Sequence, residues 1–95
     1  MAHAIVSTEK TGDAVVKASA ARLHGVVLNG DGTNGGSVVL YDHASAASGA
    51  KLLTVTLPLA THKCFAVLFP VPIAASNGLF ADLTGTNATC NVFYE

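Results

Sequence analysis

Two short runs of alternating apolar and polar residues close the chain, and they constrain its fold more than any other feature. The apolar residues that share one side are Leu79, Ala81 and Leu83 in the first run and Ala88, Cys90 and Val92 in the second. A period of two is the pattern of a half-buried β-strand. Because a turn sequence at residues 84–87 separates the runs, we expect one β-hairpin that joins the end of the chain to a sheet.

Similar short runs recur upstream, each bounded by Gly, Pro, Asn, Asp or Ser. They predict strands at residues 4–7, 14–21, 22–28, 37–42, 51–58 and 64–69. Within 22–28, alternation places Leu23, Gly25 and Val27 on one face and Arg22, His24, Val26 and Leu28 on the other. Residues 14–21 are ambiguous, because their alanines suit a helix and their valines a strand; the lack of a helix cap favours the strand. Pro70 is expected to end the strand that starts at Cys64, because proline cannot donate to a ladder.

The connections complete the pattern. Residues 29–36 hold four of the nine glycines and are expected to form a long hairpin connection, and residues 43–50 a loop with at most one turn of helix. Seven or eight short antiparallel strands without a convincing helix predict an all-β chain. We expect a single small β-sandwich over residues 11–95, of Greek-key, jelly-roll-like or immunoglobulin-like order. Residues 1–10 would be an N-terminal arm or the first strand.

Composition excludes several classes of protein. Charged residues make up 12% of the 95 residues and apolar residues 51%, which is the opposite of a disordered chain. A net charge of −1 with scattered lysines gives no footprint for nucleic acid. The longest apolar block, residues 64–75, contains two prolines and is shorter than the ~20 residues of a membrane span. Since the first residues lack the basic start of a signal peptide, we expect synthesis in a cytosol, with Cys64 and Cys90 as buried thiols.

No catalytic, cofactor or metal-binding motif is evident. The glycine-rich segment is not followed by Gly-Lys-Ser/Thr, and its single carboxylate, Asp31, is too little for a calcium loop. The four histidines, His3, His24, His43 and His62, lie in separate segments without ligand spacing. The six carboxylates are similarly dispersed, and no Gly-x-Ser-x-Gly elbow occurs. We therefore expect no catalytic residue, no cofactor and no metal, and hence a protein that is not an enzyme.

The surplus of apolar residues is the one feature that points to an activity. In the last three predicted strands one face carries smaller groups, among them Cys64, Ala66 and Leu68, and the other carries phenylalanines. A sandwich this small has one interior, so either all four phenylalanines are core or some of them contact another subunit. The candidate assembly contacts are Phe65, Phe69, Phe80 and Phe93, together with Ile5 and Val6 of the N-terminal segment, which could add an edge strand to a partner.

From about residue 5 to residue 95 the chain resembles a group of small virion proteins of tailed bacteriophages, the capsid decoration (cement) or head structural proteins. The resemblance is carried by VSTEKTG at 6–12, RLHGVVLN at 22–29, VVLYD at 38–42, SGAKLL at 48–53, NGLF at 77–80 and VFYE at 92–95. These are strand and turn patterns, and none is a catalytic signature. The two cysteines and the Pro-Val-Pro segment at 70–72 have no counterpart in the group.

The resemblance implies a protein on the capsid surface of the virion that binds the major capsid protein on the outside of the head as a dimer or trimer. From the net charge and the short apolar block, we expect no binding of nucleic acid or membrane. Two alternatives remain open at this point. One is another virion component, in the tail, the fibre base or the head–tail joint. The other is a module that binds carbohydrate or a host surface, although the chain has no tryptophan and only two tyrosines for such a platform.

Overall fold

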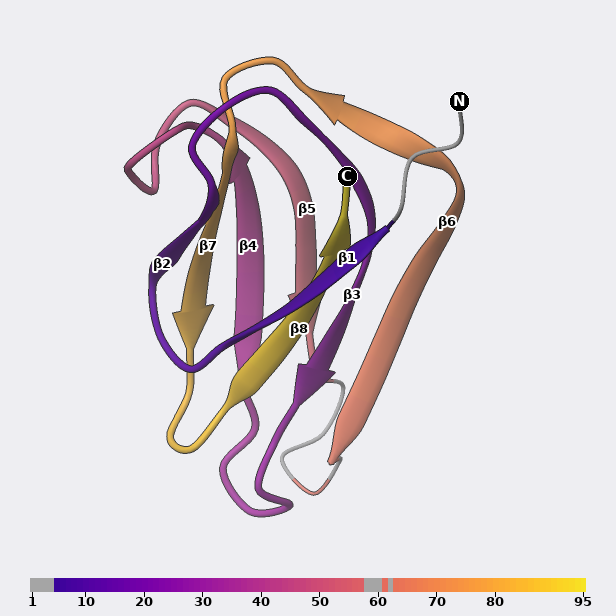
Figure 1. The fold of residues 1–95 in the computed structure, drawn as a ribbon. Helices are drawn as coiled ribbons and strands as arrows, with labels where there is room; N and C mark the ends of the chain where they lie inside the picture. The colour runs from indigo at the N-terminus through magenta and orange to yellow at the C-terminus, as the bar shows by residue number, and fades with distance from the viewer. Residues whose placement is uncertain (1–4, 58–60, 62) are drawn as a thin grey trace.

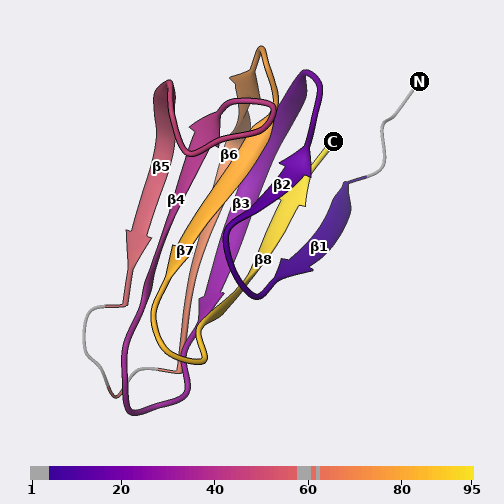
Figure 2. The ribbon, with the colours of Figure 1, turned by 90° about the vertical axis from the view of Figure 1, so that its left-hand side faces the viewer.

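A computed structural model of the protein describes residues 5–57, 61 and 63–95, and these residues contain eight strands and no helix. The strands are β1 (Val6–Lys10), β2 (Ala14–Lys17), β3 (Ala21–Asn29), β4 (Ser37–Asp42), β5 (Ala50–Thr56), β6 (Cys64–Ala75), β7 (Leu79–Thr84) and β8 (Thr89–Tyr94). Figure 1 shows them in the ribbon, and Figure 2 shows the same ribbon turned by 90°. The predicted all-β fold is confirmed.

The strands form two four-stranded antiparallel sheets. Sheet A has the order β1-β8-β3-β6, and sheet B has the order β2-β7-β4-β5. Four of the strand pairs are nested in the sequence, like the two arms of one long hairpin: β1–β8, β2–β7, β3–β6 and β4–β5. Two further pairs, β3–β8 and β4–β7, join these nested pairs within the two sheets. This is the jelly-roll arrangement, one of the three strand orders that the sequence left open.

The predicted terminal hairpin is wrong. β7 pairs with β2 and β4 in sheet B, whereas β8 pairs with β1 and β3 in sheet A, so the turn between them crosses from one sheet to the other. The long connection after β3 also crosses between the sheets and does not close a hairpin. The two strands themselves, β7 and β8, were predicted correctly. Alternation indicates that one face of a strand is buried, but it does not indicate which strand lies beside it.

The core lies between the sheets and is made of aliphatic side chains. Its buried members are Ala21, Leu23, Val26, Leu28, Val38, Leu40, Val55, Leu57, Ala75, Leu79, Ala81, Cys90 and Val92. The apolar faces that alternation groups on β7 and β8 are the inward faces, since Leu79, Ala81, Cys90 and Val92 all belong to this cluster. No charged or polar residue is buried among the described residues.

The inward face of β3 changes phase at a bulge. The pairing of β3 with both of its neighbours shifts between Leu23 and Gly25. Leu23 lies inward before the shift and Val26 after it, and both are fully buried. The sequence-based assignment, which separated Leu23 from Val26 by strict alternation, is therefore wrong at this point, because a bulge inserts an extra residue and reverses the phase.

β6 extends further than predicted. Its pairing with β3 stops at Leu68 and resumes at Ile73, so Pro70 and Pro72 occupy a stretch without ladder partners. The ladder ends near Pro70 as expected, but the strand continues to Ala75. This is possible because β6 is an edge strand with a neighbour on one side only. A proline there costs fewer ladder hydrogen bonds than it would in a central strand.

The sequence left open which face of β6 lies inward, and in the structure it is the face with the phenylalanines. Val67 is paired with Val26, whose side chain is buried, so Val67 faces the core and Leu68 faces outward. The prediction that both cysteines are buried is wrong for Cys64, which is exposed, and correct for Cys90. β3 lies between their two strands, so the cysteines are about 10 Å apart across the sheet, which is too far for a disulfide.

The remaining boundaries differ by a few residues. The strand predicted at 14–21 ends at Lys17, because the chain then turns from sheet B to sheet A. β1 begins at Val6 and is a strand of sheet A, paired along its whole length with β8. The loop predicted at 43–50 is confirmed up to the start of β5 at Ala50; it consists of bends and contains no turn of helix. His3, His62 and the end of the strand predicted at 51–58 lie outside the described residues.

Candidate functional site

The outer face of sheet A carries an apolar patch that spans three strands. Phe93 of β8 and Leu68 of β6 are both paired with Gly25 of β3, and paired residues share a face of the sheet. Since Gly25 has no side chain, Leu68 lies over it, with one methyl carbon 2.6 Å from the position that a Cβ would occupy. Val27 and Ala66, which are also paired, extend the patch. We call these four side chains, Val27, Ala66, Leu68 and Phe93, the sheet A patch.

The outer face of sheet B carries a second apolar feature. Phe80 of β7 is paired with Val15 of β2 on one side and with Tyr41 of β4 on the other. Lys51 of β5 is paired with Tyr41 and ends this row of side chains across the sheet. We call Val15, Tyr41 and Phe80 the sheet B row. Both outer faces of the sandwich thus present apolar side chains to solvent.

The six predicted assembly contacts do not form one surface. Ile5 and Val6 lie at the start of β1 and are 54% and 46% exposed. Phe65 and Phe69 lie on the inward side of β6; Phe65 is 40% exposed and Phe69 packs against the core. Phe80 and Phe93 lie half-buried on the outer faces of opposite sheets. None of the four phenylalanines belongs to the fully buried core.

The most exposed large apolar residues were not predicted. Leu68 is 67% exposed and Val71 is 74% exposed, and both belong to β6. Alternation groups Leu68 with Leu79 and Leu83 on one face, and the sequence left open whether this face lines the core. One signal was available: prolines inside an apolar strand indicate an edge strand, and an edge strand has fewer neighbours to cover it.

Three aspartates hold connections of the fold. The Asp31 carboxylate accepts hydrogen bonds from the backbone N–H groups of Thr33 and Asn34, both at 2.8 Å, and from the side-chain amides of Asn34 and Asn87. These bonds hold the pKa of Asp31 far below its usual range, since they favour the charged carboxylate. Asp31 thereby ties the β3–β4 connection to the β7–β8 turn.

Asp42 and Asp13 act in the same way elsewhere. The Asp42 carboxylate accepts the backbone N–H groups of Asn77 at 2.8 Å and Ser76 at 3.2 Å, and these bonds lower its pKa. Asp13 accepts the backbone N–H of Leu83 at 2.9 Å. Partial burial and the neighbouring Asp13 carboxyl raise the pKa of Asp82, which lies beside the sheet B row.

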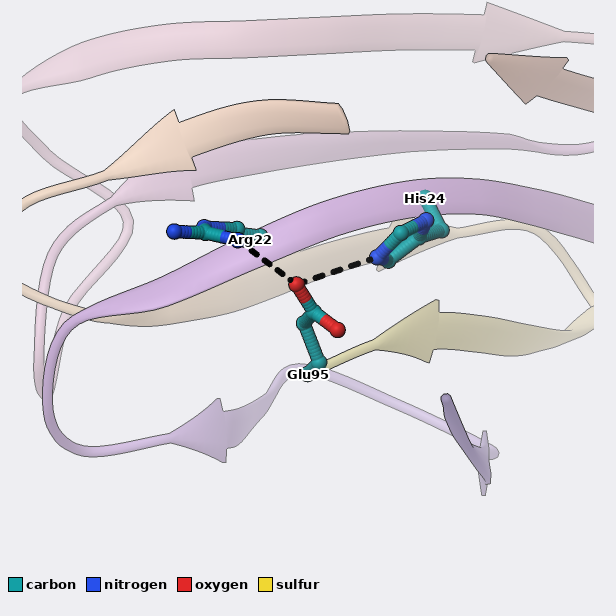
Figure 3. A network of polar contacts seen from close by, with 3 residues as sticks. All are labelled: Arg22, His24 and Glu95. Atoms are coloured by element: carbon teal, nitrogen blue, oxygen red, sulfur yellow. Dashed lines mark hydrogen bonds and ion pairs between the residues drawn. The ribbon is translucent and has the colours of Figure 1, made fainter. Parts of the chain in front are cut away.

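A polar network joins the end of the chain to β3. Arg22 and His24 both point toward the carboxylate of Glu95, as Figure 3 shows. The guanidinium of Arg22 donates to Oε1 of Glu95 at 3.0 Å, while Nε2 of His24 is 3.7 Å from the same oxygen and has no hydrogen-bond partner. Backbone bonds of 2.9 and 3.0 Å between Arg22 and Glu95 hold the strands in register. The network fixes the end of sheet A.

An open depression lies beside this network. Its volume is about 440 Å³, and its lining consists of Lys17, Ala20, Ala21, Arg22, Ala74, Ala75, Ser76 and Glu95. The alanines make its surface apolar, and the pairing of Arg22 with Glu95 neutralises one of its two cations. We interpret the depression as a gap between strand ends, because its lining does not select one class of ligand.

Within the described residues, no group of three or more His, Cys, Asp or Glu side chains is arranged to hold a metal ion. In the same part of the chain there is no helix with the length and apolarity needed to cross a membrane. The thiol of Cys90 is buried, and its burial raises its pKa to about 11, so this thiol is neutral at physiological pH.

Comparison of the chain with protein-family models, with curated proteins and with solved structures gave no match.

Proposed function

We propose that this chain is a non-enzymatic structural protein of a tailed-bacteriophage virion, and that it decorates the outside of the head by binding the major capsid protein. In this proposal it is made in the host cytoplasm and stabilises the assembled shell. The proposal starts from the resemblance of residues 5–95 to capsid decoration proteins. The jelly roll is compatible with it, because this fold is common in viral capsid domains, although lectins and cupins share it.

The single observation that carries the proposal is that both outer faces of the sandwich present apolar side chains. Leu68 is 67% exposed and Val15 is 36% exposed, and the half-buried Phe80 and Phe93 lie beside them. Contiguous apolar patches on small proteins mark interaction surfaces. An icosahedral head repeats one weak contact at many equivalent sites, so two modest patches are sufficient for stable attachment if the bound copies also contact one another.

The experiment is a measurement of copy number in purified phage particles. Quantitative mass spectrometry of the particles should give many copies of this chain per particle, in a simple ratio to the major capsid protein. A few copies per particle would instead assign it to the tail, the fibre base or the head–tail joint. Absence from purified particles would reject a virion role.

A second candidate, binding of carbohydrate or of a host surface, is favoured by the sheet B row. Tyr41 and Phe80 offer aromatic rings for stacking, and Lys51 and Asp82 lie on the same outer face as potential partners for sugar hydroxyls. Titration with a glycan panel would test it by NMR. Saturable shifts confined to Tyr41 and Phe80 would support this candidate, and their absence would leave the decoration role.

A further inference from the structure

Among the described strands, β6 is the one edge strand without a charged residue. The four strands at the edges of the two sheets are β1, β6, β2 and β5. β1 contains Glu9 and Lys10, β2 contains Lys17, and β5 contains Lys51, whereas none of the twelve residues of β6 is charged. Charged side chains on edge strands discourage pairing with other chains. β6 is also the longest of the four, and it lies at the margin of the ribbon in Figure 1.

The backbone of β6 presents hydrogen-bonding groups to this free edge. The carbonyl oxygen of Val67 lies on the β3 side, 2.6 Å from the position of a Cβ on Gly25. Successive residues of a strand direct their N–H and C=O groups to opposite sides. Cys64, Ala66 and Leu68 therefore direct theirs away from β3, where no described strand pairs with them. Beyond Phe69 the edge loses donors, because Pro70 and Pro72 have no N–H.

We propose that the Cys64–Leu68 half of β6 pairs antiparallel with the same segment of a second copy of this chain, about a two-fold axis at Ala66. In this register Ala66 lies opposite its own equivalent, and Cys64 lies opposite Leu68 of the second copy. An axis at Val67 would place Cys64 opposite a proline, and an axis at Phe65 would place Leu68 opposite residue 62, before the strand starts. The axis at Ala66 uses every available donor.

A second copy fits this edge because the edge is self-complementary. Pairing joins the two A sheets into one sheet of eight strands and sets Leu68 beside Cys64 of the second copy, on the outer face. On the inner side Phe65, which is 40% exposed in the single chain, lies opposite Val67 of the second copy, so part of its exposed surface is covered. The nearest charge, Lys63, lies opposite Phe69, so the two lysines are about 20 Å apart and do not repel at close range.

This dimer does not depend on the proposed function, since it follows from the strand edge alone. Sedimentation equilibrium of the full chain should show a monomer–dimer equilibrium. Ala66→Lys places two ammonium groups opposite each other at the axis and should weaken the dimer at least tenfold. Thr54→Lys is the matched control, because it adds the same charge to an exposed position on β5, the edge of sheet B, and should leave the dimer unchanged. A wild type that stays monomeric at every concentration, an open polymer, or equal effects of the two variants would overturn the proposal.

Amide hydrogen exchange of the unmodified chain gives an independent test if Ala66→Lys does not fold. The amides of Ala66 and Leu68 should exchange at least tenfold more slowly in the dimer than in dilute protein. The Val67 amide, which faces β3, should be equally slow in both. Exchange of Ala66 and Leu68 that does not change with concentration would exclude this interface, whatever the oligomeric state.

Discussion

Single carboxylates determine how the connections of this jelly roll are held. Each of three aspartates accepts at least one backbone N–H. Asp31 accepts it within its own loop. Asp42 accepts it from the β6–β7 connection, and Asp13 from β7 near its end. A turn leaves backbone donors without ladder partners, and a nearby carboxylate satisfies them. With few charged residues in the chain, most aspartates are engaged in structure and are not free to converge on a ligand.

The lowered pKa of Asp31 predicts a pH dependence of stability. A carboxyl whose folded-state pKa is depressed contributes stability that is fully present above its unfolded pKa of about 3.9, and this stability is lost as the pH falls further. We expect the free energy of unfolding to decline between about pH 4 and pH 2. Asp31→Asn should lower it at pH 7 and make the acid decline shallower, as measured by urea titration at each pH. An unchanged acid slope in the variant would contradict this role.

Gly25 is the second residue with a specific requirement. A Cβ there would lie 2.6 Å from both the Val67 carbonyl oxygen and a Leu68 methyl carbon, and the backbone oxygen cannot move away without disturbing the ladder. Gly25→Ala should therefore destabilise the fold by about 1–3 kcal/mol in urea unfolding. Gly12→Ala is the control, because no atom lies within 4 Å of its Cβ position, and it should change stability little. Equal effects would show that Leu68 does not pack over Gly25.

At the scale of elements, the existence of the strands could be predicted from the sequence, and their partners could not. Alternation is a local signal, so β7 and β8 were found with nearly correct bounds. Which strand lies beside which depends on how the chain crosses between sheets, and a tight turn after Thr84 is compatible with either a hairpin or a crossing. The bulge at Leu23 and Gly25 likewise leaves no local mark, yet it decides which side chains of β3 are buried.

The edge strand β1 offers a test of the pairing that the sequence did not predict. The hydroxyls of Thr8 and Tyr94 are 3.2 Å apart and link β1 to β8 by a side-chain hydrogen bond. Thr8→Val should reduce stability by about 1 kcal/mol, and adding Tyr94→Phe should cost little more, because the bond is already lost. Additive losses in this double-mutant cycle would contradict the contact.

For the whole molecule, the jelly-roll topology decides which outer face each apolar side chain reaches, and this defines the sheet A patch and the sheet B row. Apolar residues that alternate out of phase with the core, such as Phe80 and Phe93, are carried to the outer faces of two different sheets. A pattern in one strand therefore cannot tell which surface residues become neighbours; the sheet A patch joins residues of β3, β6 and β8 only after folding. The apolar surplus was predictable, and its division into two separate surfaces was not.

The two surfaces have separable roles if β6 joins two copies through sheet A. Pairing along the β6 edge leaves the outer faces of both sheets open, and we expect the sheet B row to contact the shell, with the two weak contacts of a dimer acting together. Phe80→Ser should reduce occupancy on purified heads at least tenfold and leave the dimer intact in sedimentation. Phe93→Ser, the same change on the opposite face, should leave occupancy nearly unchanged, whereas Ala66→Lys should reduce it by abolishing the second contact. If Phe93→Ser releases the protein and Phe80→Ser does not, sheet A faces the shell and the assignment of the two faces is reversed.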